Sequence, residues 1–404
     1  MIPVSKDLAN AIRFLSIDAV QKANSGHPGM PMGMADVATV LFKYYLRFNP
    51  KNPSWINRDR FILSAGHGSM LLYSLLYLTG YKSISIKDIQ NFRQLNSICA
   101  GHPEYVKNSG IETTTGPLGQ GLSNAVGMSI AEEILKKKHG SNLINHKTYV
   151  IASDGDLMEG ISHEAMSLAG HLKLKNLIVF FDNNKISIDG STDLSVSDNY
   201  KKRFESYGWS FQEINGHNEK QILKAIKKSH SSKKPSLISC KTIIGYGSPN
   251  KSGKASSHGA ALGVEEVALV RKKLKWNHEP FVIPSEILNE WRKIGEKGVI
   301  DEEKWNLIYN KKDKKIRDEI HRIISSTLPK NFEEQTASLK KKIFDMKSTQ
   351  ASRKSSAFVL ENIIENLPEL VGGSADLSGS NNTITKHSKV IKSSNFNGNY
   401  IHYG

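Results

Sequence analysis

The chain has 404 residues, of which 38% are hydrophobic, and a formal net charge of +16. This length exceeds one ordinary hydrophobic core, so two domains are expected, and no stretch approaches the ~20 apolar residues that a membrane span requires. The two cysteines, Cys99 and Cys240, form no metal-like or redox-like pair, and a reducing, cytoplasmic setting fits them best.

The positive charge leaves nucleic acid, an anionic membrane and anionic small molecules open as partners. The basic residues are scattered in short clusters, namely Lys136–Lys138, Lys201–Arg203, Lys311–Lys315 and Lys340–Lys342. Nothing resembles a zinc finger or an RNA-recognition motif. We therefore favour a lysine-rich surface on a soluble protein, with no nucleic-acid or membrane partner.

The first predicted element is an N-terminal helix. Leu8, Ile12, Leu15 and Ala19 recur at helical spacing among charged residues, which predicts an amphipathic helix and not a signal peptide. The next apolar stretch, Met70–Leu78, is predicted to be a buried helix.

The middle of the chain predicts alternating strands and helices. Lys147–Ser153 and Asn176–Asp182 have strand patterns, and Glu159–Leu174 between them has helical periodicity. A helical stretch at residues 218–229 then precedes a strand at 235–244. This repetition predicts a doubly wound α/β domain with a mainly parallel sheet, whose ligands bind at the carboxyl ends of the strands.

Charged helices with a break at Thr327–Phe332 follow between Trp291 and Ser348. A second α/β unit begins near Ser348, and the last residues, Asn397–Gly404, have the alternation of a strand. The predicted organisation is a first domain at residues 1–325, a linker at 326–347, and the beginning of an incomplete second domain at 348–404.

Polar residues directly follow two strands of the predicted sheet. Asp154 and Gly155 come after the first strand, and Asn184 follows the next. Parallel neighbouring strands would bring Asp154 and Asn184 to one sheet edge, where the Ile186 carbonyl completes half of an octahedral oxygen shell suited to Mg²⁺. Gly155 allows the backbone to approach a diphosphate closely.

Four histidines stand in glycine-flanked loops: His27, His67, His102 and His258. A tight turn with a solvent-exposed histidine explains any one of them, but packing does not explain four. A glycine-rich loop, Gly116–Gly121, leads into another predicted helix. These loops indicate a site for an anionic ligand.

Several long motifs carry a family resemblance. They are NSGHPGMPMGMAD (Asn24–Asp36), GPLGQGLSNAVGMS (Gly116–Ser129), MEGISHEAMSLAGHLKL (Met158–Leu174), SPNKSGKASSHGAALG (Ser248–Gly263) and GGSADLSGSN (Gly372–Asn381). Along its whole length the sequence resembles the transketolases, thiamine-diphosphate enzymes of the pentose phosphate pathway. The resemblance implies reversible transfer of a two-carbon ketol group from xylulose 5-phosphate to ribose 5-phosphate or erythrose 4-phosphate.

The resemblance also assigns the site residues. Asp154, Asn184 and the Ile186 carbonyl would hold Mg²⁺, with Ca²⁺ or Mn²⁺ as alternatives. Contacts with thiamine diphosphate are implied for His67, Gly116, Leu118, Gly155, Asn184, Ile188, His258 and Asp376. Catalytic and substrate-binding roles are implied for His27, His102 and His258, and Arg353 with Ser380 would grip the sugar phosphate.

This sequence departs from the motifs of the family in two places. Ser153 replaces the first glycine of the metal motif, and the loop that carries Ser380 has Ser378 and Gly379 where a proline is usual. The resemblance further implies a homodimer with active sites at the interface. It places Glu159 against the catalytic glutamate of the family, although a favourable acid at a helix N-terminus is the alternative.

Two alternatives stay open at this point. One is a dihydroxyacetone synthase-like or other thiamine-diphosphate ketol transferase. The other is a non-catalytic, thiamine-diphosphate-binding half of a split enzyme. In the family the activating glutamate comes just beyond the position of Gly404, so we expect the 404 residues alone to transfer no ketol group from xylulose 5-phosphate to ribose 5-phosphate.

Overall fold

The computed structural model describes residues 4–404, which divide into two compact units. The first unit comprises the residues up to Glu132 together with Asn145–Trp305, and the second comprises Glu133–Ile144 and Asn306–Gly404. The predicted linker, residues 326–347, contains helix α13 (Phe332–Met346). The predicted boundaries of the domains themselves stay a prediction.

A five-stranded sheet forms the centre of the first unit, in the order β1-β2-β3-β5-β4. All its pairs are parallel, and Ala152 of β2 stands opposite Phe181 of β3. The strands are β1 (Arg60–Leu63), β2 (Thr148–Ala152), β3 (Leu177–Asn183), β4 (Ser210–Asn215) and β5 (Ser236–Lys241). The predicted parallel, doubly wound α/β fold is confirmed.

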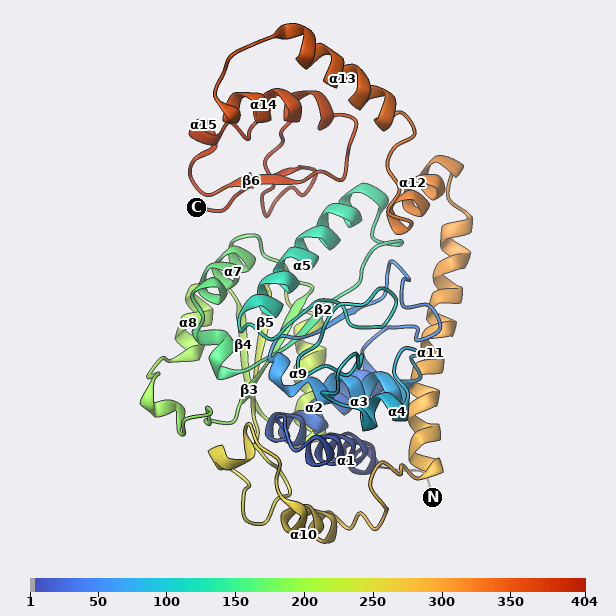
Figure 1. Cartoon of the computed structure of the whole chain (residues 1–404), viewed down its shortest axis with the longest axis vertical. Coiled ribbons are helices and arrows are strands. Elements are labelled where there is room, and N and C mark those ends of the chain that lie inside the picture. Colours follow the sequence, from blue (N-terminus) through green and yellow to red (C-terminus); the bar gives the residue numbers. More distant parts are fainter. Residues whose placement is uncertain (1–3) are drawn as a thin grey trace. The chain divides into compact units, whose positions relative to one another are not determined.

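Helices precede, connect and follow the strands of this sheet. They are α1 (Ser5–Ala23), α2 (Gly29–Tyr44), α3 (Ser69–Thr79), α4 (Ile86–Gln90), α5 (Gln120–His139), α6 (Asp154–Met158), α7 (Gly160–His171), α8 (Tyr200–Ser206), α9 (Glu219–His230), α10 (Val264–Leu274) and α11 (Ser285–Asn310), with 3₁₀ turns at η1 (Gly66–Gly68), η2 (Thr192–Leu194) and η3 (Ala255–Ser257). In Figure 1, α7 and α8 lie to one side of the sheet, and α1, α2 and α3 lie to the other.

The core strands are buried along their whole length, as a sheet covered on both faces requires. Every residue of β2 and β3 is buried. This continuous burial explains why both strands were recognisable as apolar runs, whereas β1 and β4 were missed. In β4 all residues except Ile214 are at least partly exposed, and β1 has only four residues.

Helix α1 confirms the predicted N-terminal helix but not its exposed polar face. Arg13 is 1% exposed and Asp18 is 5% exposed, because α1 packs against α2, α3, α4 and α10. Arg13 reaches Asp36 on α2 at 2.6 Å, and Asp18 reaches Arg271 on α10 at 2.5 Å. Buried charges of this kind persist only when they are paired.

The second unit contains the helices α12 to α15 and a two-stranded parallel sheet. The helices α12 (Lys314–Ile324), α13 and α14 (Ser352–Ile363) precede β6 (Gly372–Ser374), and the short helix α15 (Ser378–Asn381) follows it. The last strand, β7 (Tyr400–His402), pairs with β6 and confirms the strand expected near the last residues. None of the helices within residues 4–404 has the length and apolar character needed to cross a bilayer.

Candidate functional site

The candidate site lies at the carboxyl edge of the first unit's sheet. Strand β2 ends at Ala152 and strand β3 ends at Asn183, and the two strands are neighbours. Their parallel pairing brings Asp154, which follows β2, and Asn184, which follows β3, to the same pocket. This is the arrangement that the sequence pattern predicted.

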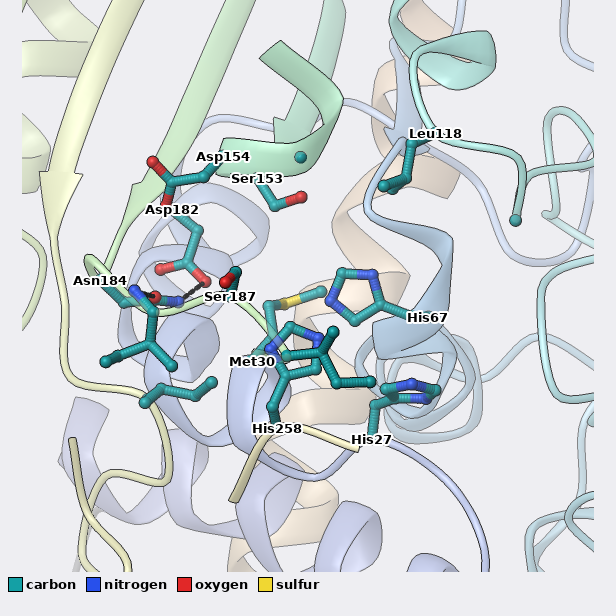
Figure 2. Close-up of a pocket in the computed structure, with 15 residues that line it drawn as sticks. His27, Met30, His67, Leu118, Ser153, Asp154, Asp182, Asn184, Ser187 and His258 are labelled. Carbon is teal, nitrogen blue, oxygen red and sulfur yellow. Dashed lines mark hydrogen bonds between the residues drawn. The ribbon is translucent and has the colours of Figure 1, made fainter. Parts of the chain in front are cut away.

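The pocket has a volume of about 270 Å³. Ten predicted site residues line it: His27, His67, Gly116, Leu118, Asp154, Gly155, Asn184, Ile186, Ile188 and His258. Figure 2 shows Asp154 and Asp182 on one side of the pocket and the rings of His27, His67 and His258 on another.

Three histidine rings form a cluster in this pocket. The rings of His67 and His258 are nearly parallel, and their centroids are 5.1 Å apart. The ring centroid of His27 lies 5.2 Å from that of His67 and 5.8 Å from that of His258. Burial, aided by the mutual repulsion of the rings, lowers the pKa of His27 to about 4 and that of His67 to about 3. Both imidazoles are therefore neutral at pH 7.

The Nδ1 atom of His258 is buried and has no hydrogen-bond partner within residues 4–404. Buried polar atoms are rarely left without a partner. This nitrogen is therefore free to meet a polar group of a ligand that enters the pocket. Burial also lowers the pKa of His258.

His102 stands at the edge of the cluster and is exposed. Its ring centroid is 6.4 Å from that of His27. The Arg93 guanidinium lies near both histidines, with Nη2 at 3.5 Å from His27 Nδ1 and Nη1 donating to Ser25 Oγ at 2.7 Å. Sequence reasoning missed Arg93, because it follows no strand and belongs to none of the glycine-rich loops.

The candidate metal ligands are hydrogen-bonded to their surroundings. The Tyr200 hydroxyl donates to Asp154 Oδ1 at 3.2 Å, and burial raises the pKa of Asp154 to about 6. The Ile186 N–H donates to Asn184 Oδ1 at 2.9 Å. These contacts restrain the side chains of Asp154 and Asn184, which both line the pocket.

Asp182 is an acidic lining residue that sequence reasoning missed. It is 1% exposed, accepts a hydrogen bond from Asn184 Nδ2 at 2.9 Å, and accepts another from Thr242 Oγ1. Burial raises its pKa to about 7, and Asp154 adds to this increase. Its position as the acid directly before the Asn-Asn pair is the signal that could have identified it. The other unpredicted lining residues are Met30, Ser153, Ser187 and Ile244.

The oxygen ligands in this pocket fit a diphosphate that is bound through a divalent cation. Asp154, Asn184 and the Ile186 carbonyl offer hard oxygen ligands, which Mg²⁺ prefers. A Cβ at Gly155 would come within 2.8 Å of Leu118 Cδ1, so glycine keeps the backbone at that wall accessible. Within residues 4–404 there is no cluster of three or more His, Cys, Asp or Glu that could hold a metal, and the predicted set contains a single carboxylate.

Arg353, Asp376 and Ser380 belong to the second unit. Arg353 is exposed in the first turn of α14, and Ser380 is exposed in α15. Asp376 is exposed and has a φ of 61°, a left-handed conformation that is uncommon for a residue other than glycine. Their roles toward the pocket stay a prediction.

Residues 4–329 match the family model described as "Transketolase, thiamine diphosphate binding domain". Over 407 residues the chain is 54% identical to a transketolase of Buchnera aphidicola and 53% identical to transketolase 2 of Escherichia coli. Each of these alignments covers 99% of this chain and 61% of the relative. The chain thus spans about 61% of the length of the curated relatives it matches.

Solved structures show the same similarity. A transketolase from Campylobacter jejuni superposes with a TM-score of 0.90 at 41% identity, and one from Pichia stipitis, in complex with sedoheptulose 7-phosphate, superposes with 0.92 at 39%. Both comparisons cover 99% of this chain and 61% of the solved chain. The chain belongs to the transketolase family and contains its thiamine-diphosphate-binding domain.

Proposed function

We propose that the protein containing this chain is a transketolase that transfers a two-carbon ketol group between sugar phosphates. The donor would be xylulose 5-phosphate, and the acceptor ribose 5-phosphate or erythrose 4-phosphate. The observation that carries the proposal is that Asp154, Asn184 and Ile186 line the same pocket as the cluster of His27, His67 and His258. Cytoplasmic location and a homodimer with shared active sites belong to the same proposal.

In this proposal the oxygens of Asp154, Asn184 and Ile186 hold Mg²⁺, which in turn binds the diphosphate. Thiamine diphosphate, when bound, supplies the carbon nucleophile and electron sink for ketol cleavage. The space occupied by the cofactor would be lined by Gly116, Leu118, Gly155 and Ile188. Its polar groups would contact His67 and His258.

The neutral histidines would handle the hydroxyl protons of the substrate. A neutral imidazole accepts a proton from a hydroxyl and returns it later, which an imidazolium cannot do. The low pKa of His27, about 4, keeps this ring in the accepting form. A bound diphosphate, through its negative charge, would move this pKa upward and toward the working pH. His102 would bind a substrate hydroxyl at the exposed rim.

Cofactor retention by the 404-residue chain tests the metal assignment. We expect the chain to keep thiamine diphosphate through gel filtration in Mg²⁺ and to lose it in a metal chelator. Asp154→Ala should reduce the retained cofactor to less than about a tenth, because removing a ligand weakens a metal site strongly. The matched control is Asp193→Ala, an exposed carboxylate in η2, which should retain as much as the unchanged chain.

Stoichiometric cofactor in Asp154→Ala would show that the ligand assignment is wrong. The chain spans 61% of the length of a transketolase relative, so we propose ketol transfer for the protein that contains these residues and not for the 404 residues alone. A coupled assay with xylulose 5-phosphate and ribose 5-phosphate measures it on that protein. There His27→Ala should lower the rate at least about tenfold, as expected for a lost proton-transfer group.

A further inference from the structure

Asp156 is completely buried two residues after Asp154, and the proposed function gives it no role. It occupies the third position of the short helix α6. Its carboxylate has four hydrogen-bond donors around it. Three of the segments that form the pocket supply them.

One carboxylate oxygen joins two segments that are far apart in the sequence. Oδ1 accepts a hydrogen bond from Ser64 Oγ at 2.8 Å and another from the Gly119 N–H at 2.8 Å. Ser64 directly follows β1, and Gly119 directly precedes α5. The same oxygen therefore links the loop after β1 to the glycine-rich loop.

The other oxygen joins the loop after β2. Oδ2 accepts from the Ser153 N–H at 3.1 Å and from the Ser153 hydroxyl at 3.3 Å. An ionised carboxylate has about four acceptor directions and no donor. Asp156 uses all four of them on backbone and hydroxyl groups of neighbouring segments.

Ser64 extends this connection into α5. Its hydroxyl, which donates to Asp156, accepts a hydrogen bond from the Leu122 N–H at 2.9 Å. A Cβ at Gly121 would come within 2.6 Å of Ser64 Cα, so the first turn of α5 packs directly on the Ser64 backbone. The start of α5 is therefore held against Ser64, the residue that follows β1.

A simple helix cap does not account for this arrangement. At the start of α6, the contact of Oδ2 with the Ser153 N–H is the one that a third-position acid makes in a capping box. The contacts of Oδ1 with Ser64 and Gly119 lie outside α6 and add nothing to its cap. They connect α6 to two other segments.

We propose that Asp156 is a positioning residue whose carboxylate holds three segments of the diphosphate-binding edge in register. The segment with Ser64 also carries His67, and the segment with Gly119 carries Gly116 and Leu118. The segment with Ser153 carries Asp154. The proposal rests on the proposed function, because it assigns these segments to one cofactor. Removing the carboxylate leaves the Gly119 and Ser153 N–H groups without an acceptor in a buried place, which favours displacement of the loops.

Hydrogen exchange of the 404-residue chain without cofactor tests the connection directly. In Asp156→Ala the amides of Gly119 and Leu122 should exchange at least tenfold faster than in the unchanged chain. Asp156→Asn keeps one oxygen acceptor and should give a smaller increase. It also serves as the test if the alanine variant does not fold.

The matched control is Asp59→Asn, at the opposite edge of the same sheet. Asp59 is 3% exposed and, like Asp156, accepts backbone hydrogen bonds from two segments, from Arg47 at 2.9 Å and from Lys147 at 2.7 Å. The Asp59→Asn variant should have a lower melting temperature, but the amides of Gly119 and Leu122 should exchange as in the unchanged chain. If Asp156 only stabilised the fold, the Asp156 variants would show this same combination.

Calorimetric titration with thiamine diphosphate and Mg²⁺ supplies the second measurement. Asp156→Ala or Asp156→Asn should weaken binding at least tenfold, and Asp59→Asn should stay within twofold. Unchanged exchange at Gly119 and Leu122, or affinity within twofold in both Asp156 variants, would overturn the inference. If the unchanged chain binds no thiamine diphosphate, the assignment of this cofactor to the pocket of the chain fails, and the exchange measurement still decides whether Asp156 holds the segments together.

Discussion

The neutral histidines of the pocket couple the stability of the fold to pH. An unfolded histidine has a pKa near 6.5, whereas the pKa of His67 in the fold is about 3. Between these values the unfolded chain binds more protons than the folded chain. The free energy of unfolding therefore falls as the pH falls from 7 toward 4.

We predict that His67→Asn makes this decline shallower between pH 7 and pH 5. The difference in slope should be at most about 1.4 kcal/mol per pH unit, the value for one proton. Urea unfolding at several pH values measures it. Equal slopes for His67→Asn and the unchanged chain would mean that His67 is protonated alike in both states.

Single residues also show the limits of sequence patterns. Asp154 and Asn184 were predictable, because each follows a recognisable strand and neighbouring parallel strands end at one edge. Asp182 and Arg93 were not. The sequence pattern places Asp182 at the end of a strand and indicates no role in the site. Arg93 lies near His27 only in the folded chain, because the two residues are 66 positions apart in the sequence.

Glycines decide how closely helices approach their neighbours. A Cβ at Gly298 in α11 would lie 1.5 Å from the Phe48 carbonyl oxygen. By contrast, Gly127 in α5 is exposed and a Cβ there would meet nothing within 4 Å. The two positions have the same residue type and helical conformation but opposite surroundings.

We predict opposite effects for alanine at these two helical positions. Gly127→Ala should stabilise the chain by about 0.5–1 kcal/mol, because alanine loses less backbone entropy in a helix. Gly298→Ala should destabilise it by about 2 kcal/mol or more, since α11 would have to move from the Phe48 backbone. Urea unfolding of both variants checks the signs, and a stabilising Gly298→Ala would contradict the packing of α11.

At the scale of the whole molecule, the net positive charge affects the stability of the fold. The formal charge of +16 repels itself more strongly in the folded chain than in the expanded unfolded chain. Salt screens this repulsion, with a Debye length of about 10 Å at 0.1 M.

We therefore predict that raising NaCl from low to moderate concentration stabilises the chain, by on the order of 1 kcal/mol. Urea unfolding at each salt concentration measures the change. Replacing the exposed Lys201 and Lys202 by glutamate lowers the net charge and should reduce the salt effect. Destabilisation by salt in the unchanged chain would show that exposed ion pairs such as Lys241–Glu213 outweigh the net repulsion.

The sequence by itself determined the alternation of strands and helices, the parallel sheet, and the edge where Asp154 and Asn184 meet, because apolar periodicity and strand-end polar residues are local patterns. It also sufficed to identify the family through long motifs. Only the tertiary structure decided that Asp182 lines the pocket, that Arg93 faces His27, and that Asp156 connects three segments. These facts depend on contacts between residues far apart in the chain, which no local pattern encodes.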